Sequence, residues 1–134
     1  MPDPAPSDID SGSSWTPAQL RVLDDAIEIE VSASRREGGP SRWTPIWVVV
    51  AGADVFVRTW HRRDTGWYGA AARSAAARIR VGDVSIDVIV TATGVTDAAA
   101  VDAAYRKKYG DLAARSMVTA EAAASTLRLD PRAD

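Results

Sequence analysis

The segment TPIWVVVAGADVFVRTW, residues Thr44 to Trp60, decides the fold predicted for this chain. Two runs rich in β-branched and aromatic residues, Ile46 to Val50 and Val55 to Trp60, flank the turn residues Ala51-Gly52-Ala53-Asp54. This pattern is typical of a β-hairpin. The first run is apolar throughout, which predicts a central strand that is covered on both faces.

Upstream of the hairpin, the sequence predicts a helix and then a strand. WTPAQLRVLDDAI begins at Trp15 and carries a capping box, with Thr16 as the N-cap and Gln19 three residues later. EIEVSAS, residues 28–34, alternates polar and apolar side chains, as a half-buried strand does. The residues that share the buried face of the helix are predicted to be Leu20, Leu23, Ala26 and Ile27.

The ends of the chain set the domain organisation. Residues 1–14 are rich in Pro, Asp, Ser and Gly and cannot bury enough apolar surface to offset the cost of ordering. We therefore predict a disordered N-terminal lead-in over residues 1–14 and one domain over residues 15–134.

Downstream of the hairpin, the predicted elements complete a barrel. WYGAAARSAAA predicts a short helix from Trp67, and RIRVGDVSIDVIVTATG predicts a second hairpin that turns at Gly82-Asp83. A helix over residues 96–110, a shorter one capped by Thr119, and a closing strand over residues 125–131 follow. Six short strands with antiparallel connections indicate an α+β fold, mainly β with flanking helices, in which the sheet forms a small antiparallel barrel.

Composition excludes several kinds of chemistry. The chain has no cysteine, which excludes disulfides, thiolate catalysis and cysteine-bound metals, and its one histidine, His61, excludes a histidine-rich metal site. The net charge of -2 gives no overall attraction to nucleic acid or anionic lipid. No apolar run reaches the roughly 18 residues of a membrane helix and no signal peptide is visible, so we expect a soluble, cytoplasmic protein.

One segment, VRTWHRRDTGWYGAAARS over residues 57–74, concentrates residues that suit a ligand. Arginine presents forked donors to phosphate oxygens, threonine and the amides at a helix start add neutral donors, and aromatic rings cover a planar ring system. The candidates from this pattern are Arg58, Trp60, Arg62, Arg63, Thr65, Trp67 and Tyr68. The alternative is that the loop arginines are solvated and that Trp67 and Tyr68 anchor the core.

Other conspicuous residues have simpler interpretations. His61 is more often a surface histidine than a general base in such a context. Carboxylates such as Asp102 on predicted helix faces are interpreted as solvated charges, and the basic end of YRKKYG suits the helix dipole without any nucleic-acid partner. Trp43 and Trp47 are core residues, a ligand wall or a subunit contact.

Several of these motifs together resemble a known family. TPIWVVVAGADVFVRTW, TGWYGAAARSAAARIRVGDVSIDV, DAAYRKKYG and TLRLDP are similar to the small bacterial family known as domain of unknown function 2255. That family resembles the flavin-binding split-barrel superfamily, which includes pyridoxamine phosphate oxidases and deazaflavin-dependent reductases. The resemblance runs from about Ile27 to the end of the chain. It implies a six-stranded split β-barrel, often a homodimer with the cofactor between its subunits.

The resemblance also implies which residues bind a cofactor. It assigns cofactor-phosphate contacts to Arg58, Thr59, Arg62, Arg63 and Trp67. The lysine-serine phosphate pattern of the pyridoxamine phosphate oxidases is absent, because no lysine precedes Lys107. We assign no catalytic residue and no metal ligand.

The predicted function is the binding of a flavin (FMN) or a deazaflavin, with oxidoreductase activity as its extension. The alternative is a non-enzymatic small-ligand-binding or interaction module on the same barrel, with no cofactor at all. Single-stranded nucleic-acid binding through stacked rings is disfavoured by the acidic pI of about 5.4. The expected partner is a small planar ligand that bears phosphate, with no nucleic acid and no membrane.

A homodimer is also predicted from the residues. The stretch from Trp43 to Val50 is apolar apart from Thr44 and has no charge. Alternate side chains of a strand face opposite sides, so one set would form an exposed apolar patch. Pairing two copies about a two-fold axis would bury that patch, with Trp43 or Trp47 inside the interface.

Overall fold

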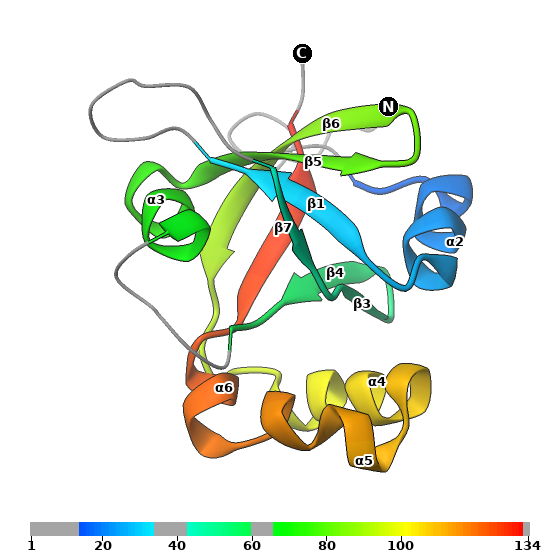
Figure 1. Cartoon of the computed structure of the whole chain (residues 1–134), viewed down its shortest axis with the longest axis vertical. Helices are drawn as coiled ribbons and strands as arrows, with labels where there is room; N and C mark the ends of the chain where they lie inside the picture. The colour runs from blue at the N-terminus through cyan, green and yellow to red at the C-terminus, as the bar shows by residue number, and fades with distance from the viewer. Residues whose placement is uncertain (1–13, 34–42, 60–65, 133–134) are drawn as a thin grey trace, which may run out of the picture.

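Seven strands form one curled antiparallel sheet in the computed structural model, which describes residues 14–33, 43–59 and 66–132 (Figure 1). The strand order is β2-β1-β5-β6-β7-β4-β3. The strands are β1 (Ile29–Ser32), β2 (Thr44–Ile46), β3 (Val49–Ala51), β4 (Asp54–Val57), β5 (Ala76–Val81), β6 (Val84–Ala92) and β7 (Leu127–Pro131). The predicted class, mainly β with flanking helices, is confirmed, with seven strands in place of six.

The prediction of one central strand over residues 46–50 is wrong. The run is divided between β2, which ends at Ile46, and β3, which begins at Val49, and these two strands lie at opposite ends of the strand order. Pro45 in β2 has no amide hydrogen to donate, which suits a sheet edge. The expected burial on both faces does occur at Val48 and Val49, which are fully buried in two different apolar clusters. One continuous segment therefore supplies both ends of the sheet, and the sheet between them curls into a half-barrel.

The corner between β2 and β3 is completed by the end of helix α4 (Ala98–Tyr109). The amide of Val48 donates to the hydroxyl of Tyr109 at 3.3 Å. The Nζ of Lys108 donates to the carbonyl of Val48 at 2.7 Å and to that of Leu23 at 3.0 Å. An unpaired buried peptide group costs about 1–3 kcal/mol, so these two side chains make the corner tolerable. The basic end of YRKKYG thus has a structural role beyond the helix dipole.

Helices cover the two sides and one end of the half-barrel (Figure 1). The capping box is confirmed, because the Thr16 side chain accepts from the Gln19 amide and the Gln19 side chain accepts from the Thr16 amide. Ile27, predicted on the buried face of the first helix, is 73% exposed because that helix ends at Asp25. Besides α4, the helices are α2 (Pro17–Asp25), α3 (Gly66–Ser74), α5 (Asp111–Ala114), the 3-10 turn η1 (Arg115–Met117) and α6 (Ala120–Ala124).

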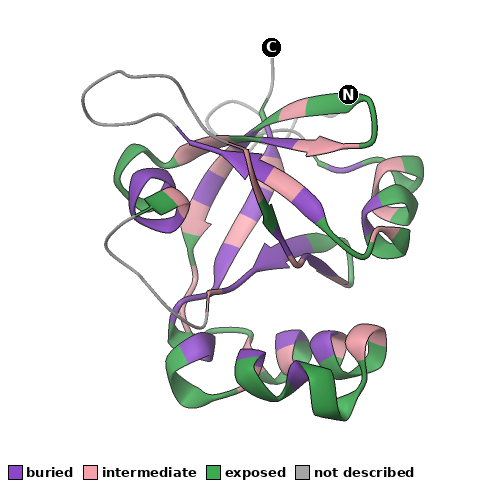
Figure 2. Ribbon diagram, in the orientation of Figure 1, coloured by how far each residue is buried: buried purple, intermediate pink, exposed green. Residues whose placement is uncertain are grey.

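Two apolar clusters hold the layers together, and β4 belongs to both. Successive side chains of a strand face opposite sides. Val55 and Val57 therefore lie in the cluster inside the half-barrel, whereas Phe56 faces α4 and packs with Tyr105 in the second cluster. Figure 2 shows the corresponding burial along the strands and on the inner faces of the helices. The second cluster consists of Val49, Phe56, Val101, Tyr105, Ala114 and Met117.

Replacing Lys108 by methionine should destabilise the protein, because the carbonyls of Val48 and Leu23 lose their shared donor while the aliphatic stem is kept. We expect the free energy of unfolding in urea to fall by about 1–3 kcal/mol. Lys107→Met, at the exposed neighbouring position, is the matched control and should change it by less than about 0.5 kcal/mol. Equal effects of the two substitutions would show that the corner does not depend on this contact.

Candidate functional site

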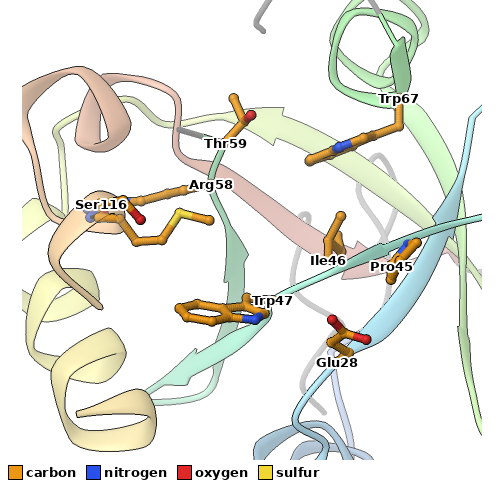
Figure 3. A pocket seen from close by; sticks show the side chains of 9 residues that line it. Glu28, Pro45, Ile46, Trp47, Arg58, Thr59, Trp67 and Ser116 are labelled. Carbon is orange, nitrogen blue, oxygen red and sulfur yellow. Dashed lines mark hydrogen bonds between the residues drawn. The ribbon is translucent and has the colours of Figure 1, made fainter. Parts of the chain in front are cut away.

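A pocket of about 330 Å³ opens beside the end of β4 (Figure 3). Trp47 enters it from the corner between β2 and β3, and Trp67 enters it from α3. Its described lining residues are Glu28, Pro45, Ile46, Trp47, Arg58, Thr59, Trp67, Ser116 and Met117. Five of these nine residues are apolar or aromatic and four are polar or charged, so the wall can both cover a ring and bind polar groups.

The indole of Trp47 is held by a stacked neighbour. Its ring and that of Tyr109 lie with centroids 3.9 Å apart and planes inclined by 6°. The Tyr109 hydroxyl donates to the carbonyl of Ile27 at 2.6 Å, which fixes the phenol ring in turn. Trp47 remains half-buried. One face of the indole is therefore covered, and the rest of the ring is left to line the pocket.

Arg58, the first predicted phosphate ligand, lies in a buried ion pair. The alternation along β4 directs its side chain toward α4, and the side chain is 0% exposed. Its Nη1 donates to Asp102 Oδ1 at 2.6 Å and to the carbonyl of Met117 at 2.7 Å, while Nε donates to Thr126 Oγ1 at 2.8 Å. Asp102 is therefore not the solvated charge predicted from its helix face, because it balances this guanidinium.

One nitrogen of the Arg58 guanidinium is still unpaired. Among the described residues, Nη2 has no hydrogen-bond partner, although the atom is buried. The guanidinium carbon lies 5.6 Å from the centre of the Tyr105 ring. Burial raises the pKa of the Tyr105 phenol well above its usual range, and the charge of Arg58 opposes that rise. Arg58 thus belongs to the pocket wall with its charge balanced, and the two N–H groups of Nη2 have no partner among the described residues.

The other described candidates divide between pocket and core. Thr59 lines the pocket, and its backbone is fixed by Ser125, whose hydroxyl accepts from the Thr59 amide and donates to the Thr59 carbonyl, both at 3.0 Å. Trp67 also lines the pocket and meets Tyr68 edge-to-face, with centroids 5.6 Å apart. Tyr68 itself is only 7% exposed and packs in the core of the half-barrel, as its alternative interpretation has it.

The remaining candidates, Trp60, Arg62, Arg63 and Thr65, and also His61, lie outside the described residues. Their roles stay predictions. Within residues 14–33, 43–59 and 66–132, no group of three or more acidic or histidine side chains is placed to hold a metal ion. In the same ranges, no helix has the length and apolar character needed to cross a bilayer.

Sequence patterns miss much of the pocket wall. Trp47 does line it, and a ligand wall is one of the predicted alternatives for that residue. Glu28, Ser116 and Met117 carry no local signal, because they come from segments that only the strand order brings together. Because successive side chains along β4 face opposite sides and Val57 lies inside the half-barrel, Arg58 lies on the α4 side of the sheet.

A curled antiparallel half-barrel with this strand order and a pocket beside its fourth strand defines a split-barrel protein. The chain belongs to the family described as an uncharacterized protein conserved in bacteria, DUF2255, whose profile matches residues 19–129. The family predicted from the sequence motifs is therefore confirmed.

Solved structures share this fold at low sequence identity. HutZ, the heme storage protein from Vibrio cholerae, has a TM-score of 0.60 and 7% identity over 91% of this chain and 92% of its own. A FAD-binding protein from Mesorhizobium loti has a TM-score of 0.55 and 8% identity over 91% of this chain and 92% of its own. A putative pyridoxamine 5'-phosphate oxidase from Listeria innocua has a TM-score of 0.52 and 8% identity over 84% of this chain and 87% of its own. These likenesses establish the fold alone, and no curated protein sequence matches the chain significantly.

Removing the carboxylate of Asp102 should leave Arg58 as an uncompensated buried charge. We expect Asp102→Ala to lower the free energy of unfolding in urea by about 3 kcal/mol, the lower end for a buried pair because Asp102 keeps 23% of its side-chain surface exposed. The matched control is Asp87→Ala, since the pair of Asp87 with Arg78 at 2.7 Å is more than half exposed on both sides, at 51% and 57%. Its transition midpoint should hardly move. A small effect at both positions would contradict the structural role of the buried pair.

Proposed function

We propose that this protein binds a flavin- or deazaflavin-type cofactor in the pocket lined by Trp47 and Trp67, and that it acts as an oxidoreductase. The observation that carries the proposal is the presence of two indole rings, from distant elements, in the wall of one pocket. Flat ring systems are recognised by stacking on such rings. Trp67 would stack on the cofactor ring, and Trp47, already oriented by its stack on Tyr109 at 3.9 Å, would line the wall beside it.

Polar groups of the same pocket suit the oxygens of such a cofactor. Thr59 and Ser116 bring hydroxyl groups to the pocket wall, whereas the Arg58 side chain, including its unpaired Nη2, is buried. Among the described lining residues, Arg58 is the one cation and Asp102 already balances it. The described wall therefore fits the ring system better than the phosphate. The contribution of Arg62 and Arg63 to phosphate binding stays a prediction from the sequence.

The shared fold supports the proposal without deciding it. A FAD-binding protein and a putative pyridoxamine 5'-phosphate oxidase have this fold, and so does a heme storage protein. Heme is also flat, so the indole rings by themselves do not distinguish it from a flavin. When bound, a flavin or deazaflavin supplies hydride or electron transfer, and the protein binds the ring and excludes water from one face.

Titration of the purified protein with FMN, FAD and a deazaflavin, followed by visible absorbance and ligand fluorescence, tests the proposal. We expect at least one of the three to change its spectrum on binding. Trp67→Leu should weaken that binding roughly tenfold or more, because stacking on one aromatic ring is worth about 1–3 kcal/mol. Trp67→Phe keeps an aromatic face and is the matched control, expected to lose less. If none of the three ligands responds, or if the leucine variant binds as tightly as the parent, this function is wrong.

We also propose that the protein is a homodimer, on a smaller apolar surface than the sequence suggests. Val48 and Val49 are buried within one chain, so they do not contribute to an exposed patch. Trp43 and Trp47 remain half-buried, and Leu112, three residues after Tyr109, is 75% exposed. Apolar side chains left at the surface in this way favour burial against a second copy.

Light scattering at micromolar concentration should give a mass of twice 14.3 kDa. Trp47→Arg or Trp43→Arg should return the monomer mass, because an arginine within an apolar interface of about 1,000 Å² or more is costly to bury. Val84→Arg is the control for Trp47→Arg, since Val84 is an exposed apolar residue at the turn between β5 and β6 and does not line the pocket of Trp47. A parent protein of 14.3 kDa would rule the dimer out.

A further inference from the structure

The charge of the pocket wall is one-sided. Glu28, the residue before β1, lines the pocket with an exposed carboxylate (Figure 3). Asp102 balances the charge of Arg58, and the other described lining residues are neutral. Among the described residues, Glu28 therefore gives this pocket its one uncompensated charge.

The Glu28 carboxylate lies near the stacked pair of Trp47 and Tyr109. The Tyr109 hydroxyl donates to the carbonyl of Ile27, the residue adjacent to Glu28, at 2.6 Å. Burial raises the pKa of the Tyr109 phenol, and the charge of Glu28 adds to that rise. Figure 3 shows the Glu28 carboxylate turned toward the pocket on the side from which Trp47 enters.

An indole and a carboxylate at one pocket edge attract the same class of ligand. The face of an indole ring carries negative potential, so it attracts cations, and substituted ammonium groups above all. The negative carboxylate adds a charge-charge attraction that an anion or a neutral ring would not gain. The described residues do not provide the ligands for a bare metal ion, because no cluster of three or more acidic or histidine groups occurs among them.

We propose that the edge of this pocket binds a small substituted ammonium compound between the indole of Trp47 and the carboxylate of Glu28, as the second ligand of the site. The inference rests on the proposed function in taking this pocket as the site, and it adds the class of substrate that would reach the cofactor. Amines and quaternary ammonium compounds are selected, and carboxylates and phosphates are repelled from this edge.

Choline and its neutral isostere, in which a tert-butyl group replaces the trimethylammonium group, provide the test. They have nearly the same shape and differ in charge. We expect choline to bind at least about fivefold more tightly in calorimetry of the purified protein, with and without FMN. Glu28→Gln should remove most of that preference while leaving the affinity for the neutral compound unchanged. Glu121→Gln, an exposed carboxylate on α6 outside the pocket, is the control and should keep the preference.

Equal affinities for the two compounds, or a preference that survives in Glu28→Gln, would overturn the inference. The result is separable from that of the cofactor titration. A protein that binds FMN but does not prefer choline retains the proposed function and loses this second ligand. A protein that prefers choline through Glu28 but binds none of the three cofactors retains the ammonium site and loses the proposed function.

Discussion

Hydrogen bonding at one buried corner is the constraint on which the rest of the structure depends. The chain must pass from one end of the sheet to the other between β2 and β3, and Val48 at that point is fully buried. Its amide and carbonyl are outside any strand ladder and beyond the reach of bulk water. Lys108 and Tyr109 supply the missing partners from the end of α4. Tyr109 then stacks on Trp47, so the contact that closes the half-barrel also orients one wall of the pocket.

A second buried contact fixes the opposite wall. Arg58 joins β4 to α4 through Asp102, to η1 through Met117 and to the start of β7 through Thr126. A charge placed among four elements is tolerated only when it is paired, and it then allows little freedom in how those elements meet. Thr59 follows directly and is held by Ser125. The polar side of the pocket is therefore as firmly positioned as the aromatic side.

Local patterns in the sequence predict most of the elements, because local physics forms them. The capping box at Thr16 and the tight turn of the second hairpin, where Val81 pairs with Val84, both depend on neighbouring residues. The division of residues 46–50 between two strands does not depend on neighbouring residues. It depends on the strands with which β2 and β3 pair. Pro45 is the one local sign of an edge strand there. The sequence also predicts Trp67 and Thr59 as site residues. It does not predict Glu28, which lines the same pocket.

Long-range pairing explains what sequence patterns could not predict in the candidate site. Arg58 and Asp102 are 44 residues apart, so neither residue indicates the other without the fold. The same holds for Ser116 and Met117, which reach the pocket on a 3-10 turn that has no distinctive pattern. A solvated arginine and a buried one have the same local sequence. Only the alternation along β4, which places Val57 inside and Arg58 outside the half-barrel, distinguishes them.

The position of β7 has a consequence for synthesis of the chain. This strand, the last of those in the described part of the chain, lies between β6 and β4, and it also accepts a hydrogen bond from the Trp15 indole through the Leu129 carbonyl, 114 residues away. The ribosome translates β4 more than sixty residues before its partner strand β7, since Thr59, just after β4, and Ser125, just before β7, are 66 positions apart. Until Pro131 has emerged, the nascent chain carries an apolar hairpin with one open edge, free to pair with other chains. The sheet can therefore close only after β7 has been translated.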